Sequence, residues 1–279
     1  MTSPSTTLAA WAGSWLRGES APDDLVDALH RWAPMHLVFA QDAVSAGRSG
    51  LPYPEPAATG VAALLQTLRR TVADRPGAEV RLVLPAAGDV STLPAGTGFA
   101  EAALAAGHGI LVGPPGSHGI GVVPAAEAPD VLRWTVHDVP EIPLSGHATG
   151  LGEAEYAIRE AVRAAADAVG ELALVSGSAA DARAAVAAAL DDAARHPYPG
   201  TLPPRALRIL DSADHVAAIV TAADATGPGG NGAGAVVGAV ATRAVDSVSA
   251  AALEAHLRPL RAAVRLARTA AVNAGARVS

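Results

Sequence analysis

The spacing of hydrophobic and polar residues changes twice along the chain, and only the middle stretch alternates. In AEVRLVLP the apolar residues Val80, Leu82 and Leu84 lie on one side of an extended chain, with Arg81 on the other. LRWTVHDV alternates in the same way, and two short apolar runs, GILVG and GIGVVP, lie between these stretches. We predict a small, largely antiparallel four-stranded sheet with one polar face, and a short helix at about 97–106. The predicted strands are 79–85, 109–113, 119–124 and 131–138.

The residues on both sides of this sheet region carry the three-to-four residue spacing of amphipathic helices. In SAPDDLVDALHRW, Ser20 as a cap residue, Pro22 and two acidic residues mark a helix start. After Pro34, MHLVFAQDAV is interpreted as a resumed helix. The predicted fold class is α+β and mostly helical, as one compact unit or two apposed domains. Its parts are an N-terminal helical region (1–76), a small sheet region (77–148, with strands between about 79 and 138) and a C-terminal helical bundle (149–279).

Composition narrows the chemistry more than the fold. Hydrophobic residues make up 50% of the 279 residues and aromatic residues only 3%, so the interior is built from many small contacts of Ala, Val and Leu. The chain has no cysteine, which excludes thiolate nucleophiles, iron–sulfur clusters and cysteine-ligated zinc. It also has no lysine, which excludes Schiff-base chemistry and a Walker-type phosphate loop. An alanine-rich chain whose basic residues other than histidine are all arginine is typical of a high-GC bacterium.

No stretch of the sequence carries a targeting or membrane signal. The N-terminal residues lack a basic segment followed by a continuous apolar one. The longest uncharged runs, 102–126 and 225–242, are both interrupted by glycine and proline, and the first also contains two histidines. We therefore expect a cytoplasmic protein that does not cross a membrane.

The glycine-rich residues 113–121, GPPGSHGIG, do not have the spacing of a nucleotide-binding loop. Gly116, Gly119 and Gly121 give G-x-x-G-x-G, whereas dinucleotide-binding loops have G-x-G-x-x-G between a strand and a helix. We predict a hairpin turn whose glycines satisfy the turn geometry. The alternative is a loop that presents Ser117 or His118 to a ligand.

Candidate catalytic side chains gather in or beside the predicted sheet. They are Asp89, His108, His118 and His137, together with Asp138. An imidazole of near-neutral pKa beside a carboxylate can act as a general base. The alternative is that these are separate loop or surface residues. The nine histidines contain no recognised metal-binding spacing, so we expect neither a metal nor a cofactor.

A row of arginines marks the last predicted helix, in a chain whose formal net charge is −7. Residues 257–277 hold five arginines and no acidic residue. An apolar stripe for packing on another helix is made of Leu253, Leu257, Leu260, Val264, Ala267 and Ala271. Each arginine of the row follows a stripe residue by one position, about 100° around the helix; the row is Arg258, Arg261, Arg265 and Arg268. This face is either solvated and paired with acids of the same chain, or a binding surface.

The leading hypothesis is a non-catalytic interaction or small-ligand-binding protein, because no catalytic motif is found. Its partner would be an acidic protein or a phosphorylated small molecule held by the arginine row. The alternative is a small metabolic enzyme acting through Asp89, His108, His118 and His137. Nucleic-acid binding through the arginine row is a weaker alternative, because the chain is acidic and that face has no interleaved aromatic residues. Helical surfaces also suit a homo-oligomer.

Overall fold

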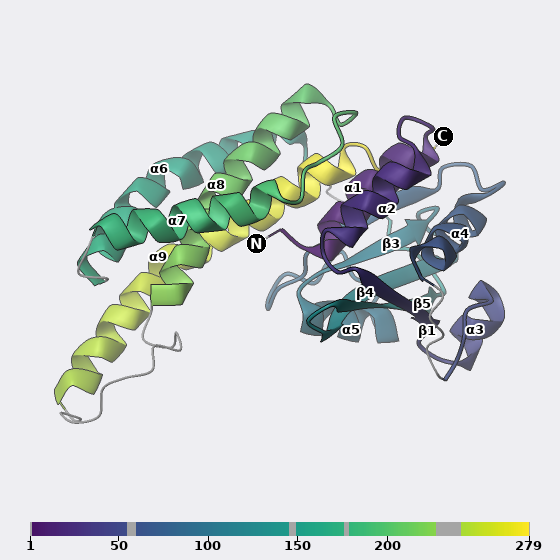
Figure 1. Ribbon diagram of the computed structural model, residues 1–279, viewed down its shortest axis with the longest axis horizontal. Coiled ribbons are helices and arrows are strands. Elements are labelled where there is room, and N and C mark those ends of the chain that lie inside the picture. The colour runs from purple at the N-terminus through teal and green to yellow at the C-terminus, as the bar shows by residue number, and fades with distance from the viewer. Residues whose placement is uncertain (1, 55–59, 145–148, 176–178, 227–240, 279) are drawn as a thin grey trace. The chain divides into compact units, whose positions relative to one another are not determined.

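A computed structural model describes residues 2–54, 60–144, 149–175, 179–226 and 241–278 (Figure 1). These residues have an α+β fold and form two compact units. The sheet unit comprises 2–149, 196–207 and 269–279, and the helical unit comprises 150–195 and 208–268. Each unit is therefore assembled from stretches that are separate in sequence.

The sheet unit is built on a five-stranded mixed sheet with strand order β1-β5-β4-β3-β2. Its strands are β1 (Met35–Ala40), β2 (Glu79–Val83), β3 (Gly109–Gly113), β4 (Gly119–Ala128) and β5 (Val131–Val139). The strands β2 to β5 pair antiparallel with their neighbours, as predicted. The strand β1 lies at the edge, parallel to β5.

Residues 35–40 form a strand, so the sequence-based prediction of a helix there and of only four strands is wrong. Every second residue of β1 from His36 to Ala40 is buried, and Leu37 and Phe39 between them are half-buried. A strand that is apolar on both faces shows no alternation in its sequence, and its short apolar run is hard to distinguish from a helical one. The sheet is therefore mixed rather than four-stranded and antiparallel.

Helices cover both faces of the sheet. They are α1 (Pro4–Leu16), α2 (Pro22–His30), α3 (Ala43–Ser49), α4 (Gly60–Val72) and α5 (Gly98–Ala106). On one face α2 contacts both α1 and α4, and α5 covers the other face (Figure 1). Beneath α5, a Cβ on Gly121 would lie 2.1 Å from the ring of Phe99, so only glycine admits this ring. The short helix α3 contacts β1 and β5.

The C-terminal tail, residues 273–278, closes the outer edge of β2. The backbone N–H of Val80 donates to the Ala276 carbonyl at 2.9 Å. The Asn273 side chain accepts from the Leu82 N–H at 2.8 Å and donates to the Leu82 carbonyl at 3.0 Å. Unpaired backbone groups on an edge strand invite association with other chains, and the tail satisfies them here.

A second stretch from the C-terminal half, residues 196–207, docks on the N-terminal helices. The indole N–H of Trp11 donates to the Pro197 carbonyl at 3.0 Å. The Trp32 ring stacks on His196, with 3.7 Å between ring centroids. These contacts explain why this stretch belongs to the sheet unit although helices of the other unit precede and follow it.

The helical unit contains α6 (Leu151–Val175), α7 (Ala179–Ala194) and most of α8 (Pro204–Thr226) and α9 (Ala241–Asn273). The predicted apolar stripe of α9 is buried from Leu257 to Ala271, and the side chain of Leu253 lies outside the described part. Pro259 lies inside α9. None of the helices described here is both long and apolar enough to cross a lipid bilayer.

Candidate anion-binding site

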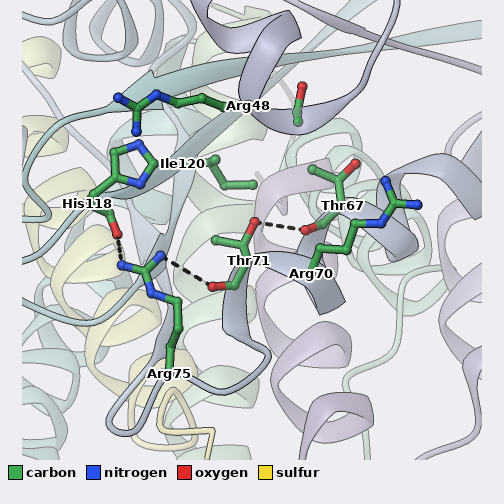
Figure 2. A pocket seen from close by; sticks show the side chains of 8 residues that line it. Arg48, Thr67, Arg70, Thr71, Arg75, His118 and Ile120 are labelled. Atoms are coloured by element: carbon green, nitrogen blue, oxygen red, sulfur yellow. Dashed lines mark hydrogen bonds between the residues drawn. The ribbon is translucent and has the colours of Figure 1, made fainter.

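The sheet unit carries a basic pocket where the β3–β4 hairpin turn meets α3 and α4 (Figure 2). Its cavity volume is ≈ 180 Å³. The lining residues are Arg48 and Ser49 of α3, Thr67, Arg70 and Thr71 of α4, Arg75 after α4, and His118 and Ile120 at the start of β4. Three of these side chains are guanidinium groups and none is acidic, so the lining favours an anion.

Helical spacing on α4 explains how three of the lining residues come together. Arg70 and Thr71 follow Thr67 by three and four residues, so all three side chains share one face of the helix. The helix ends at Val72, and Asp74 then takes a left-handed conformation with φ 55°, which turns the chain. The Arg75 side chain that follows points back toward the hairpin turn (Figure 2).

The pocket residue His118 is paired with Asp138, which lies behind it and does not itself line the pocket. The His118 Nε2 and Asp138 Oδ1 atoms lie 2.5 Å apart, and the Arg48 Nε atom lies 3.3 Å from the same oxygen. The carboxylate accepts from Nε2–H, so in the neutral ring the lone pair is on Nδ1. Asp138 is held in turn, because its backbone N–H donates to the Ser45 hydroxyl at 2.9 Å. The hydrogen bond to Asp138 therefore fixes the orientation of the His118 ring, and Nδ1 is the ring nitrogen that remains for another partner.

Arg75 and Arg70 are the two other guanidinium groups of the pocket. The Arg75 guanidinium donates to the backbone carbonyl of His118 and, at 3.5 Å, to that of Thr71 (Figure 2). Arg70 is exposed. Within the part of the chain that the structure describes, neither guanidinium has a carboxylate partner. Because Asp138 offsets Arg48, the positive charge of these two arginines is left without compensation.

The hydroxyl groups of the pocket are committed as donors to the helices that carry them. Thr67, Thr71 and Ser49 each donate to the carbonyl four residues earlier, at 2.8, 2.8 and 2.6 Å. The guanidinium and imidazole groups are therefore the donors left for a ligand. Among the described residues no three His, Asp or Glu side chains converge in a way that would hold a metal ion.

The four candidate catalytic residues do not assemble into one site. Of the four, only His118 lines the pocket. Asp89 is an exposed loop residue whose backbone pairs with Ala86. His108 lies at the other end of β3 from the hairpin turn, where its Nδ1 is 3.0 Å from the Ser5 hydroxyl. Burial lowers the pKa of His108.

His137 lies on the opposite face of the sheet from the pocket, because it neighbours Asp138 on β5 and side chains alternate between faces. It is 3% exposed, and among the described residues neither of its ring nitrogens has a hydrogen-bond partner. Burial lowers its pKa to about 4, and the Asp42 carboxylate opposes part of that shift. The Phe99 ring lies edge-on to it at 6.0 Å between centroids. His137 is therefore a neutral core residue at pH 7.

The arginine row of α9 belongs to the helical unit, and its members differ in burial and in their ion pairs. Arg268 is 3% exposed, and its Nη2 lies 2.5 Å from Asp214 Oδ1 on α8. Arg261 bonds Glu254, with a shortest distance of 2.7 Å, and also Asp224. Its hydrogen bond lowers the pKa of Glu254.

The rest of the row is more open: Arg265 is half-buried and Arg258 is exposed. A partner for the row would therefore meet Arg258 first, while Arg261 and Arg268 would have to exchange the acids they already bind. Partner binding by the row stays a prediction.

Sequence reasoning did not select Arg48, Arg70 or Arg75. The one local signal is the placement of Arg70 between two threonines on a polar helix face, but such a face is usually only solvated. Arg48 and Arg75 reach the pocket through the ends of α3 and α4, which no spacing rule connects to His118. The prediction that the 113–121 loop is a hairpin is confirmed, and His118 at its end lines the pocket; presentation of this loop to a ligand stays a prediction.

Comparisons with known proteins cover nearly the whole chain. Residues 5–148 match the Rv1486c-like protein, N-terminal domain, and residues 152–269 match the Rv1486c-like protein, C-terminal domain. The chain is 41% identical over 289 residues to "Uncharacterized protein Rv1486c" of Mycobacterium tuberculosis H37Rv, which covers 97% of this chain and 96% of that protein. It is 39% identical over 301 residues to "Uncharacterized protein ML1804" of Mycobacterium leprae, with the same coverage. No solved structure matches it. The chain belongs to the Rv1486c-like protein family.

Proposed function

We propose that this protein binds a small anionic ligand, a phosphorylated molecule, in the basic pocket of the sheet unit. The observation that carries the proposal is the pair of pocket arginines, Arg70 and Arg75, which have no carboxylate partner among the described residues. Two uncompensated guanidinium groups at one cavity repel one another, and a ligand with two negative charges would relieve that repulsion. Guanidinium groups also match phosphate oxygens through paired hydrogen bonds.

Titration calorimetry with inorganic phosphate and glycerol phosphate at low ionic strength tests this proposal. We expect saturable binding to the wild type and about tenfold weaker binding to Arg70→Gln, because hydrogen bonds to charged groups contribute roughly 1.5–3 kcal/mol. Arg69→Gln is the matched control: it is also exposed and adjacent on α4, but it does not line the pocket. Equal affinities for the wild type and both variants, or no binding at all, would overturn the proposal.

The second candidate function is an enzyme that acts on phosphate esters through His118. The observation that favours it is the Asp138 carboxylate behind the imidazole, since a fixed tautomer is what a general acid or base needs. In this version Asp89, His108 and His137 have no part. Turnover of p-nitrophenyl phosphate that is lost in His118→Gln and kept in His137→Gln would support it. Binding without turnover would leave the non-catalytic function standing.

A further inference from the structure

The Asp138 contact gives the pocket an additional property, which rests on the proposed function. We infer that the pocket takes the dianionic phosphoryl group of a phosphomonoester together with one proton, which is bound at His118 Nδ1. The ligand class would then be set by charge as well as by shape, and binding would depend on pH.

The balance of charge around the pocket favours a dianion. Arg48 and Asp138 form an ion pair, and Arg70 and Arg75 remain. A phosphomonoester carries about −1.5 to −2 charges at pH 7, which matches these two arginines. A phosphodiester or a simple carboxylate carries one charge and would leave one guanidinium without compensation.

The size of the pocket limits how much of the ligand it encloses. A cavity of ≈ 180 Å³ is smaller than the roughly 300–1,000 Å³ of sites that enclose drug-sized molecules. It suits a phosphoryl group and a few further atoms. Arg75 turns toward His118, and Arg70 lies beyond Thr71 from them in Figure 2. Arg70 would therefore have to turn its guanidinium toward Arg75 and His118 for all three groups to contact one phosphoryl group.

The charges that face His118 explain why its proton would arrive with the ligand. Asp138 on β5 favours the imidazolium, and the three pocket arginines, Arg48 on α3, Arg70 on α4 and Arg75 after α4, oppose it. A bound dianion reverses this balance, because it neutralises the opposing charges and accepts a hydrogen bond from Nδ1–H. A neutral ring would instead direct the Nδ1 lone pair at an anion. Protonation and binding are therefore mutually favourable.

Titration calorimetry in two buffers with different ionisation enthalpies, PIPES and Tris, measures this proton directly. Sulfate is the decisive probe, because it stays a dianion across the pH range, whereas the second pKa of a phosphate ester is about 6. At pH 7.5 we expect uptake of 0.5 to 1 proton per sulfate bound. The affinity for sulfate should rise severalfold from pH 8 to 6.5. Dimethyl phosphate, a monoanion, should bind at least tenfold more weakly than phosphate.

Variants separate this inference from the function on which it rests. His118→Gln should still bind sulfate, more weakly, but without proton uptake and without the pH dependence. His215→Gln is the control, because that histidine is exposed on α8 in the helical unit. If the wild type binds no anion, the proposed function fails. If it binds anions through Arg70 but takes up no proton, or if uptake persists in His118→Gln, the proposed function stands and the proton-linked site is wrong.

Discussion

The two groups of arginines in this protein differ in what neutralises them. On α9, Arg261 and Arg268 bind acids of the helical unit, and Arg268 is almost fully buried. In the sheet unit, Arg70 and Arg75 line a cavity without a carboxylate partner among the described residues. The α9 row is the group that is conspicuous in the sequence, because its arginines recur at helical spacing with no intervening acid.

The difference teaches that basic density along a sequence is a poor guide to a binding site. An arginine is available for ligand binding when no carboxylate of the folded protein neutralises its charge. Whether a carboxylate does so depends on which acidic residues other elements bring close to it. The partners of the α9 row lie on α8 as well as on α9 itself, whereas no carboxylate in the described ranges pairs with Arg70 or Arg75. Of the following four predictions, ordered from the largest effect to the smallest, three test this contrast and one tests the buried His137.

Breaking the ion pair between Arg268 of α9 and Asp214 of α8 should have the largest effect on stability. Arg268→Met takes the buried guanidinium away from the half-buried Asp214 carboxylate, which should lower the free energy of unfolding by about 3 kcal/mol or more. Urea denaturation measures this loss, and Arg258→Met, an exposed member of the same row, should change it by less than about 0.5 kcal/mol. Adding Asp214→Leu to Arg268→Met should recover much of the loss. Similar small losses in both single variants would mean that the row is equally solvated.

Acid should destabilise the protein through His137. Its pKa is about 4 in the folded protein, against 6.5 as the reference value, so between these pH values the unfolded chain binds a proton that the folded chain does not. The free energy of unfolding should therefore fall by about 3 kcal/mol as the pH drops from 6.5 to 4. His137→Leu should remove most of that part of the loss in denaturation measured across this range. His118→Leu is the comparison: its histidine is paired and half-exposed. An unchanged pH slope in His137→Leu would contradict the assignment.

Arg75 should have a moderate effect on stability, because its partners are backbone carbonyls rather than a carboxylate. Arg75→Met removes donors from the carbonyls of His118 and Thr71 and should cost about 1 kcal/mol in urea denaturation. A loss as large as that of Arg268→Met would show that the pocket arginine is structural in the same sense as that ion pair.

Arg70 should have the smallest effect on stability and a clear effect on binding. Without ligand, Arg70→Gln and Arg69→Gln should both lie within about 0.5 kcal/mol of the wild type, since both side chains are exposed. With 50 mM phosphate, the midpoint of thermal unfolding should rise for the wild type and Arg69→Gln, and it should rise less for Arg70→Gln. Equal rises in all three proteins would mean that the stabilisation is a general salt effect.

Much of the sheet follows from local pattern, and the exceptions have definite physical causes. The predicted antiparallel strands were confirmed because each has either alternation or a short apolar run between glycines. The strand β1 was missed because both of its faces are covered and its partner β5 lies far along the chain. No local pattern indicates that 196–207 and 269–279 belong to the sheet unit, since that depends on backbone and ring contacts with distant residues.

The candidate site was predictable only for the residues that the sheet itself holds. His118 and Asp138 were singled out, and antiparallel pairing of β4 with β5 explains their meeting: the neighbouring Gly119 and Val139 are opposite one another. His108 and His137 had equal claims from the sequence. His108 lies at the opposite end of β3 from the pocket, and His137 lies on the opposite face of the sheet. Both facts depend on the assembled sheet, so neither residue could be excluded from the sequence.

The tail on β2 has a consequence for synthesis at the ribosome. The edge residue Leu82 and its partner Asn273 are 191 positions apart. At a translation rate of roughly 5–20 residues per second, the nascent sheet waits about 10–40 s with this edge open. During that interval the emerging strand is a template for any other extended segment, including the same strand of a neighbouring chain on one messenger RNA. Residues 273–278 therefore act as an intramolecular chaperone, and their arrival ends the period in which nascent chains can pair with one another.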